Sequence, residues 1–352
     1  MDNSLQDCGF VPFFVRQTSL DELEQGRVGR VTEVQRSLII VFDGSDERSI
    51  PLTSSWHNAA PEDRPTVGDW VVLDKQLSRV ERVLDRKSAF RRVAAGDKAQ
   101  IQLLAANIDV LFIVTSCNAE FHESRLERYL ALAVEAGIMP VVVLTKGDLS
   151  DDADSYAERA RRVQPGVPVE PVNALDRSTL GGVIAWIERG STIAMVGSSG
   201  VGKSTLLNTL AETELAATNE IREDDKKGRH TTSHRALHRL PGGGLLIDVP
   251  GIRELKVAAV DVALASVFDD IDAMAKQCRF SDCRHEYEPD CAVRNAIENG
   301  EIDARRLRNY LKLKRENERN TASLAEKRLQ DRAFGKHVKR VKAMKQHERD
   351  GN

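Results

Sequence analysis

The chain has 352 residues, of which 41% are hydrophobic and 30% are charged. This composition is typical of a water-soluble globular protein with two or three domains. No apolar run approaches the ~18 residues that cross a bilayer, and the amino terminus lacks the basic start of a signal peptide. Five cysteines, an odd number, argue against a secreted disulfide framework. We therefore expect a cytoplasmic protein that does not enter a membrane.

The formal net charge of −3 is distributed unevenly along the chain. Residues 301–352 carry 16 Lys and Arg against 8 Asp and Glu, a net +8 that leaves −11 for the rest. A basic tail on an acidic body is typical of proteins that meet a polyanion. A solvated helix of mixed charge has the same composition, so charge alone leaves both interpretations open.

The amino-terminal part of the chain is rich in short β-type runs. Residues 1–25 indicate no firm element and are expected to form an N-terminal tail. Between residues 26 and 90, apolar runs alternate with turn residues. The runs are 27–34, 37–42, 49–52, 70–73 and 80–84. They predict a small β-barrel of OB type, and an SH3-like barrel would produce much the same pattern.

The middle and the end of the chain have different patterns. Residues 91–256 alternate strands with helices, which predicts an α/β domain with a parallel sheet covered on both faces. Strands are expected at 110–115, 141–144, 169–172 and 193–196, helices at 124–136 and from 204 onward, and a hairpin over 234–249. Residues 257–352 are mostly helical, are interrupted by a cysteine cluster, and end in a long charged helix.

A glycine-rich loop lies between a predicted strand and a predicted helix. It fits the phosphate-loop pattern Gly-x-x-x-x-Gly-Lys-Ser, in which glycines let backbone N–H groups turn towards a phosphate. The helix that follows directs its positive end to the same place. Lys203 is predicted to reach the β- and γ-phosphates, and the hydroxyl of Ser204 to hold Mg²⁺. The nucleotide contacts predicted here are Gly197, Ser198, Ser199, Gly200, Val201, Gly202, Lys203, Ser204 and Thr205.

Two segments are expected to read the base of the nucleotide. The motif Thr145-Lys146-Gly-Asp148 follows a predicted strand. The carboxylate of Asp148 can accept both N1–H and N2–H₂ of guanine, groups that adenine does not offer. Lys146 is expected to lie along the base plane. Asn173-Ala174 lies where a backbone N–H is expected to reach guanine O6.

An acidic motif comes last among the nucleotide motifs. Asp248-Val-Pro-Gly251 follows an apolar run, so Asp248 can hold Mg²⁺ through a water and Gly251 can offer its N–H to the γ-phosphate. In ordinary GTPases the phosphate loop precedes the base-reading motif, whereas here it follows it. The rotated order predicts a circularly permuted P-loop GTPase.

A polar segment between these motifs is a candidate switch loop. In Gly228-Arg-His230-Thr231-Thr232, a threonine could complete the Mg²⁺ shell, with Thr231 the metal ligand we select. Many GTPases place a water-orienting glutamine directly after the acidic motif, and this chain has Ile252 there. Intrinsic hydrolysis is therefore expected to be slow, with His230 the nearest candidate for positioning water.

Cysteine and histidine are concentrated near the carboxyl-terminal end. Cys278, Cys283, His285 and Cys291 supply three thiols and an imidazole within fourteen residues. Four such ligands suit tetrahedral Zn²⁺ with a closed, structural coordination shell. The alternative is three buried free thiols and a surface histidine.

Together these motifs resemble the bacterial ribosome small-subunit-dependent GTPase A family, over roughly residues 26–300. The string from Gly228 to Thr232 and the zinc pattern with Glu288-Pro289 are specific to it. The resemblance implies an OB-fold, a permuted GTPase domain and a zinc domain in that order. It also implies a late assembly factor of the 30S ribosomal subunit that binds 16S rRNA, cycles between GTP and GDP with subunit-stimulated hydrolysis, and positions the attacking water with His230.

The chain departs from the common pattern at two positions. Thr145 replaces the asparagine of most GTPases, which is expected to loosen guanine binding, and Asn173 stands where a serine often precedes the alanine. We expect a monomer whose catalytic residues are His230, Lys203, Thr231 and Thr232. The alternatives are an ATP-using phosphotransferase, which Asp148 argues against, and an RNA-binding scaffold in which the nucleotide is structural.

Overall fold

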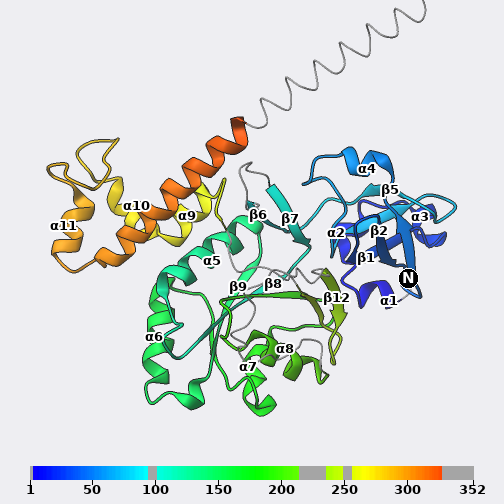
Figure 1. The fold of residues 1–352 in the computed structure, drawn as a ribbon, viewed down its shortest axis with the longest axis horizontal. Coiled ribbons are helices and arrows are strands. Elements are labelled where there is room, and N and C mark those ends of the chain that lie inside the picture. The colour runs from blue at the N-terminus through cyan, green and yellow to red at the C-terminus, as the bar shows by residue number, and fades with distance from the viewer. Residues whose placement is uncertain (1–2, 94–100, 214–234, 249–255, 327–352) are drawn as a thin grey trace, which may run out of the picture.

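The structure is a computed structural model that describes residues 3–93, 101–213, 235–248 and 256–326. Its described strands form one long mixed sheet in the order β10-β9-β8-β11-β13-β12-β1-β2-β3, with β4 and β5 continuing from β1, and a separate two-stranded ribbon, β6-β7. Figure 1 shows three lobes: a β-rich amino-terminal lobe, a central α/β lobe and a helical carboxyl-terminal lobe. No helix of the described part is both long and apolar enough to cross a bilayer.

The amino-terminal lobe is an antiparallel array ordered β3-β2-β1-β4-β5. Its strands are β1 (Val28–Val34), β2 (Leu38–Phe42), β3 (Glu47–Pro51), β4 (Trp70–Leu73) and β5 (Val80–Val83), and a short helix α4 (Ser54–Asn58) lies between β3 and β4. Each expected run contains or overlaps one of these strands. Among the described residues no pairing joins β3 to β5, so closure into an OB-type barrel stays a prediction.

The first residues, for which the sequence indicates no element, pack against this lobe as short helices. They are α1 (Asn3–Gln6), α2 (Pro12–Val15) and α3 (Leu20–Glu24). The ring centroids of Phe10 and Phe14 lie 4.7 and 5.8 Å from that of Trp70, which is fully buried. Helices of four or five residues are too short to show a helical period, and the segment is distinguished from a tail by its tertiary contacts, which also include ion pairs of Asp7 with Arg189 and of Glu22 with Arg82.

A buried arginine joins the amino-terminal lobe to the central lobe. Arg30 is 1% exposed, and its guanidinium donates to Thr192 Oγ1 at 2.7 Å and to the carbonyl oxygens of Cys8, Gly68 and Asn107. Burial lowers its pKa to about 10, so it stays protonated at neutral pH. Its four partners come from four separate segments of the chain, and one cation therefore holds them together.

The central lobe is a parallel sheet with helices on both faces, as the sequence predicts. Its strands are β8 (Val110–Ser116), β9 (Met139–Thr145), β10 (Val169–Pro171), β11 (Thr192–Val196) and β13 (Leu245–Asp248), with β12 (Arg235–Arg239) antiparallel to β13. Along β8, Leu111 and Ile113 join one core while Phe112 and Val114 join the other. This alternation shows that both faces of the strand are buried.

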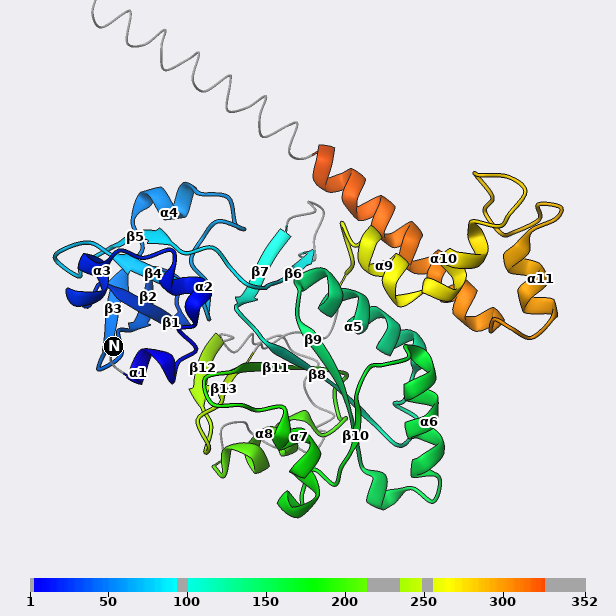
Figure 2. The ribbon, with the colours of Figure 1, turned by 180° about the vertical axis from the view of Figure 1, so that it is seen from behind.

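The two faces of this sheet are covered by different helices. Helices α5 (Glu123–Ala136) and α6 (Ala153–Val163) pack on the first core, and α7 (Gly181–Ala185) and α8 (Lys203–Ala211) pack on the second. Figure 2 shows both pairs from behind. Helix α5 ends as expected at Gly137, which adopts a left-handed φ of 69°.

The hairpin of β6 (Ala89–Val93) and β7 (Ile101–Ala106), which connects the first two lobes, has no clear signal in the sequence. Phe90 and Leu104 are buried in the first core, but Arg91 is exposed and interrupts the apolar pattern on β6. Helix α6 is also not among the expected elements, and its buried face consists of Ala157, Ala160 and Val163.

The carboxyl-terminal lobe is helical, as predicted. It contains α9 (Asp261–Val267), α10 (Asp269–Ala275), α11 (Ala292–Glu298) and a long helix over residues 304–326. The long helix runs past α5 of the central lobe (Figure 1). Its Arg305 and Arg306 donate to the fully buried carboxylate of Glu127 on α5 at 3.0 and 3.1 Å.

Arg306 is the centre of this contact between lobes. It also bonds to Asp270 at 2.8 and 2.9 Å and donates to the carbonyl oxygens of Val163 and Val267 at 2.8 and 2.7 Å. Its guanidinium lies 4.8 Å from the ring centroid of Phe268. Removing this buried guanidinium is costly, because its carboxylate and carbonyl partners would lose a charged hydrogen-bond donor.

We predict that Arg306→Ala lowers the free energy of unfolding by about 3–5 kcal/mol, the usual cost of breaking a buried ion pair from one side. Urea unfolding of the full chain measures the effect. The control is Arg162→Ala, whose side chain is 78% exposed and forms an ion pair with Glu158, and which we expect to change stability by less than ~0.5 kcal/mol. A loss below about 1 kcal/mol in Arg306→Ala would contradict the role given to this network.

Candidate functional site

The predicted nucleotide motifs meet at one edge of the central sheet. Strands β9, β8, β11 and β13 are neighbours and run parallel, so their carboxyl ends lie side by side. From β8 the chain passes to β9 on one side and later to β11 on the other. Such a reversal of strand order opens a crevice at the carboxyl ends, where α/β proteins bind their ligands.

The phosphate loop leaves β11 at this edge and enters α8. At Gly197, where φ is 151°, a Cβ atom would lie 2.2 Å from the carbonyl oxygen of Val114 on β8, so only glycine allows this close approach. Gly202 has a left-handed φ of 89° and caps α8, which begins at Lys203. The loop therefore has the backbone that the motif predicts, with Ser204 and Thr205 in the first turn of the helix.

Lys203 is folded back onto the loop it follows. Its ammonium group donates to the carbonyl oxygen of Gly197 at 2.9 Å and to that of Ser198. The side chain therefore already lies along the loop, and its charge is held where the terminal phosphates are expected.

The base-reading motif is tied directly to the phosphate loop. Thr145, at the end of β9, is fully buried, and its hydroxyl lies 2.6 Å from the carbonyl oxygen of Val201 and 3.2 Å from that of Thr115. Lys146 Nζ donates to the carbonyl oxygen of Gly200 at 2.7 Å. The residue that replaces the usual asparagine therefore holds the two loops together.

The other base-reading residues lie on either side of this contact. Asp148 is exposed on the short 3₁₀ helix η1 (Gly147–Leu149). Among the described residues its carboxylate has no hydrogen-bond partner, so it is available to the donor groups of a ligand. Ala174 lies beside α8, since its carbonyl oxygen accepts from Thr209 Oγ1 at 2.7 Å. Asn173 shapes its own turn, because its side-chain oxygen accepts from Leu175 N at 3.0 Å.

Two apolar side chains that the motifs do not include flank these residues. Leu149 follows Asp148 and Leu175 follows Ala174, and each is 79% exposed. Exposed leucines on both of the loops predicted to read the base offer apolar surface that suits the faces or edges of a flat base. The sequence carries no separate signal for them, because a leucine in a loop is usually incidental.

Several predicted residues cannot be placed. Asp248 ends β13, at the same edge as the phosphate loop, but its side chain lies outside the described part. Gly251, His230, Thr231 and Thr232 lie outside the described residues altogether. The magnesium ligands beyond Ser204 and the residue that positions water therefore remain predictions.

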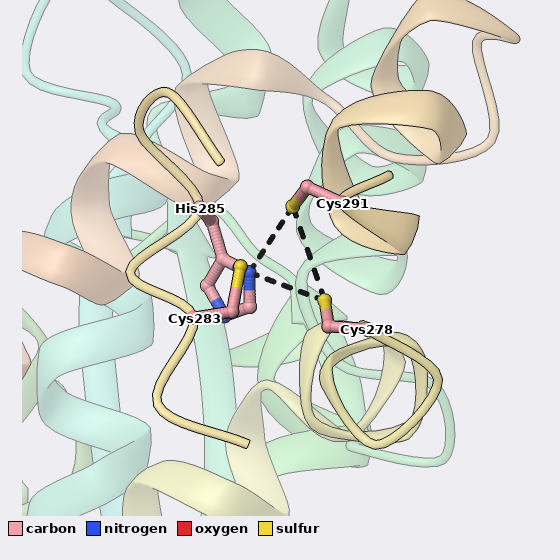
Figure 3. Close-up of side chains that lie close together, drawn as sticks. All are labelled: Cys278, Cys283, His285 and Cys291. Atoms are coloured by element: carbon pink, nitrogen blue, oxygen red, sulfur yellow. Dashed lines mark hydrogen bonds between the residues drawn. The ribbon is translucent and has the colours of Figure 1, made fainter. Parts of the chain in front are cut away.

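The cysteine cluster forms the geometry expected of a metal site. The ligand atoms of Cys278, Cys283, His285 and Cys291 all lie within 4.8 Å of one another (Figure 3). Cys278 Sγ lies 3.9 Å from Cys291 Sγ, close to the ~3.8 Å that Zn–S bonds of about 2.3 Å give in a tetrahedron. Burial lowers the pKa of His285, which favours the neutral imidazole that binds metal.

A carboxylate shapes the loop that carries these ligands. Glu288 accepts the backbone N–H groups of Arg284, Glu286 and Tyr287 at 2.9, 3.0 and 3.0 Å. These bonds hold the pKa of Glu288 at about 2. Within the loop, His285 has a left-handed φ of 61°, so the backbone needs such support to present the imidazole to the thiols.

We predict that Glu288→Gln weakens zinc binding by about 10- to 100-fold, the range for groups that orient metal ligands. Competition with a chromophoric chelator measures the affinity. Glu298→Gln, an exposed change on α11, serves as the matched control. Equal affinity in the Glu288 variant and the control would show that the loop does not depend on this carboxylate.

Comparison with known proteins agrees with this geometry. The family model described as RsgA GTPase matches residues 83–258. A "Small ribosomal subunit biogenesis GTPase RsgA 2" from Vibrio parahaemolyticus is 45% identical over 96% of this chain and 93% of its own length. The Mesorhizobium japonicum protein named "Small ribosomal subunit biogenesis GTPase RsgA" is 42% identical over 90% of this chain and 91% of its own.

Two solved structures share the fold. YjeQ from Thermotoga maritima is 27% identical, with a TM-score of 0.59 over 82% of this chain and 96% of its own. YloQ, described as a circularly permuted GTPase, has a TM-score of 0.57 at 24% identity over 84% of this chain and 96% of its own, a likeness of fold. The family model and these relatives show that this protein belongs to the RsgA GTPase family and is a circularly permuted GTP hydrolase.

Proposed function

We propose that this GTPase acts in the late maturation of the small ribosomal subunit, binding 16S rRNA in the 30S particle and hydrolysing GTP there to trigger its own release. The relatives named above are small ribosomal subunit biogenesis GTPases. The observation that carries the proposal is the contact of Thr145 and Lys146 with the phosphate loop. It builds one site for the base and phosphates of a guanine nucleotide.

The roles of the site residues follow from their places at the sheet edge. The loop from Gly197 to Gly202 turns its N–H groups towards the phosphates, and Lys203 neutralises the terminal ones. Asp148 and Lys146 recognise guanine. The N–H of Ala174, on a turn shaped by Asn173, reaches O6 of the base.

Magnesium is the expected companion of the nucleotide. Ser204 and Thr231 would ligate Mg²⁺, with Asp248 acting through a water and Gly251 donating its N–H to the γ-phosphate. The ion supplies charge that stabilises the phosphoryl group in transfer. Because the side chain of Ile252 has no hydrogen-bonding group, His230 is the residue we assign to hold the attacking water, beside Thr232.

The lobes correspond to proposed functional domains. We assign residues 1–25 to an N-terminal extension, 26–90 to an OB-type barrel, 91–256 to the GTPase domain and 257–352 to a zinc-binding helical domain. The barrel and the zinc domain would contact rRNA, with Zn²⁺ at Cys278, Cys283, His285 and Cys291 as a structural ion. The protein would work in the cytoplasm as a monomer.

The first prediction concerns the base. Asp148→Asn replaces an acceptor pair with an amide, which suits the carbonyl at C2 of xanthine better than the amino group of guanine. We expect the variant to lose affinity for GDP and gain affinity for the xanthosine nucleotide. Titration with fluorescent nucleotides measures both. Unchanged GDP affinity would overturn the assignment of Asp148.

The second prediction concerns the ribosomal subunit. Without a glutamine at position 252, turnover of the free protein should be slow, and 30S subunits should raise it by several orders of magnitude, since assisting groups contribute ~10³–10⁵ in related reactions. Phosphate release is measured with and without purified subunits. Equal turnover in both would favour the alternative of an RNA-binding scaffold whose nucleotide is structural.

A further inference from the structure

Arg125 lies beside the phosphate loop although no nucleotide motif contains it. It is in the first turn of α5, and its guanidinium donates to the hydroxyl of Ser198, the second residue of the loop. The two residues are separated by 73 positions in the chain. The close approach of β8 and β11, whose carboxyl ends are adjacent, brings them together.

The position of this contact identifies the part of the nucleotide that Arg125 would meet. Lys203, the residue that reaches the β- and γ-phosphates, bonds to the carbonyl oxygens of Gly197 and Ser198. Lys146, from the base-reading motif, bonds instead to Gly200. Ser198 therefore lies at the terminal-phosphate end of the loop, and Arg125 with it.

The guanidinium of Arg125 is only weakly committed to other partners. Its ion pair with Glu120 has an N–O distance of 3.4 Å, and the two side chains are 35% and 48% exposed. Exposed pairs of this kind contribute little. By contrast, a guanidinium matches the oxygens of a phosphate in shape and charge. A triphosphate is thus a better partner for Arg125 than Glu120 or the serine hydroxyl.

We propose that Arg125 leaves Ser198 when GTP binds and contacts the γ-phosphate, acting as a third cation of the catalytic site with Lys203 and Mg²⁺. This inference rests on the proposed nucleotide site. In hydrolysis, the oxygen of water bonds to the γ-phosphorus as the bond to the β,γ-bridging oxygen breaks; the electron pair of that bond stays on the β-phosphate of GDP, and both protons of the water end on the phosphate product. Arg125 stabilises the charge on the γ-phosphoryl oxygens during this transfer.

The rest of α5 makes this arginine well suited to the task. One turn further along the helix, Arg128 forms two bonds of 2.7 Å with Glu316, and the carboxylate of Glu127 is held by the long carboxyl-terminal helix. The start of α5 is therefore fixed from the side away from the nucleotide. A rigid base keeps the guanidinium near the phosphates at little entropic cost.

The test compares the triphosphate and diphosphate affinities of Arg125→Ala. We expect affinity for GTPγS to fall about 10- to 100-fold, the worth of a hydrogen bond between charged groups, and affinity for GDP to change less than about 2-fold. Single-turnover hydrolysis of GTP should fall by at least as much as GTPγS affinity. Arg125→Lys keeps the charge but not the planar guanidinium, so its affinity for GTPγS should lie between those of the parent protein and Arg125→Ala.

Two further variants make the outcome decisive. Arg162→Ala, exposed on α6, should match the parent protein in every assay. Lys203→Ala should lose both nucleotides, and normal binding by it would overturn the proposed site itself. If Lys203→Ala fails while Arg125→Ala binds both nucleotides like the parent, only this inference is overturned. Equal losses of affinity for GTPγS and GDP in Arg125→Ala would also overturn this inference. Such a result would indicate that Arg125 supports the conformation of the phosphate loop and does not contact the γ-phosphate.

Discussion

The contact on which the structure most depends is the one that holds the chain as it leaves the acidic motif. Val257 N donates to Glu316 at 3.1 Å, and Asn320 donates to the carbonyl oxygen of Val257 at 2.8 Å. Asn317 accepts from Val260 N at 3.1 Å on the same face of the long helix. Because the chain is permuted, the segment that senses the γ-phosphate in GTPases continues directly into the carboxyl-terminal lobe. These bonds hold the carboxyl-terminal end of that segment against the long helix.

The same helix is joined to the nucleotide site by a second route. The carboxylate of Glu316 accepts hydrogen bonds from Val257 N and from the guanidinium of Arg128 on α5. The first turn of α5 also carries Arg125, which lies beside the phosphate loop. Burial would raise the pKa of the Glu316 carboxyl, but Arg128 and Val257 lower it, with a net downward shift. One carboxylate therefore links the start of α5 with the chain that follows the acidic motif. Coupling between two binding sites is reciprocal. If the nucleotide changes the affinity of this helix for a partner, that partner changes the affinity for the nucleotide by the same factor.

Much of the fold and site could be predicted from the sequence, for physical reasons that differ between regions. The phosphate loop has strict backbone needs, which show as glycines at 197 and 202, and the strands around it are buried on both faces and read as apolar runs. The cluster of three cysteines and a histidine was predictable because its residues are close in the chain and few residue types can serve as zinc ligands.

What the sequence does not reveal depends on contacts between distant residues. The packing of Phe10 and Phe14 on Trp70 holds the first helices against the lobe, whereas the local sequence offers only a capping box at Ser19 and Glu22 and a proline at the start of α2. Thr145 reads as a departure from a motif until its bond to Val201 is seen. Arg125 reads as one more charge on an amphipathic helix, because its place beside Ser198 follows only from the order of strands in the sheet.

We expect the nucleotide site and the carboxyl-terminal lobe to be coupled through the hydrogen bonds of the Val257, Ala259 and Val260 amides. Hydrogen exchange of the amides in residues 256–261 tests it most directly, measured with GDP and with a non-hydrolysable GTP analogue at saturation. Ala259 N donates to Thr321 Oγ1 at 3.0 Å, so all three amides report on the same helix. If this coupling exists, the protection of these amides from exchange differs between the two nucleotides. Identical exchange in both states would contradict it.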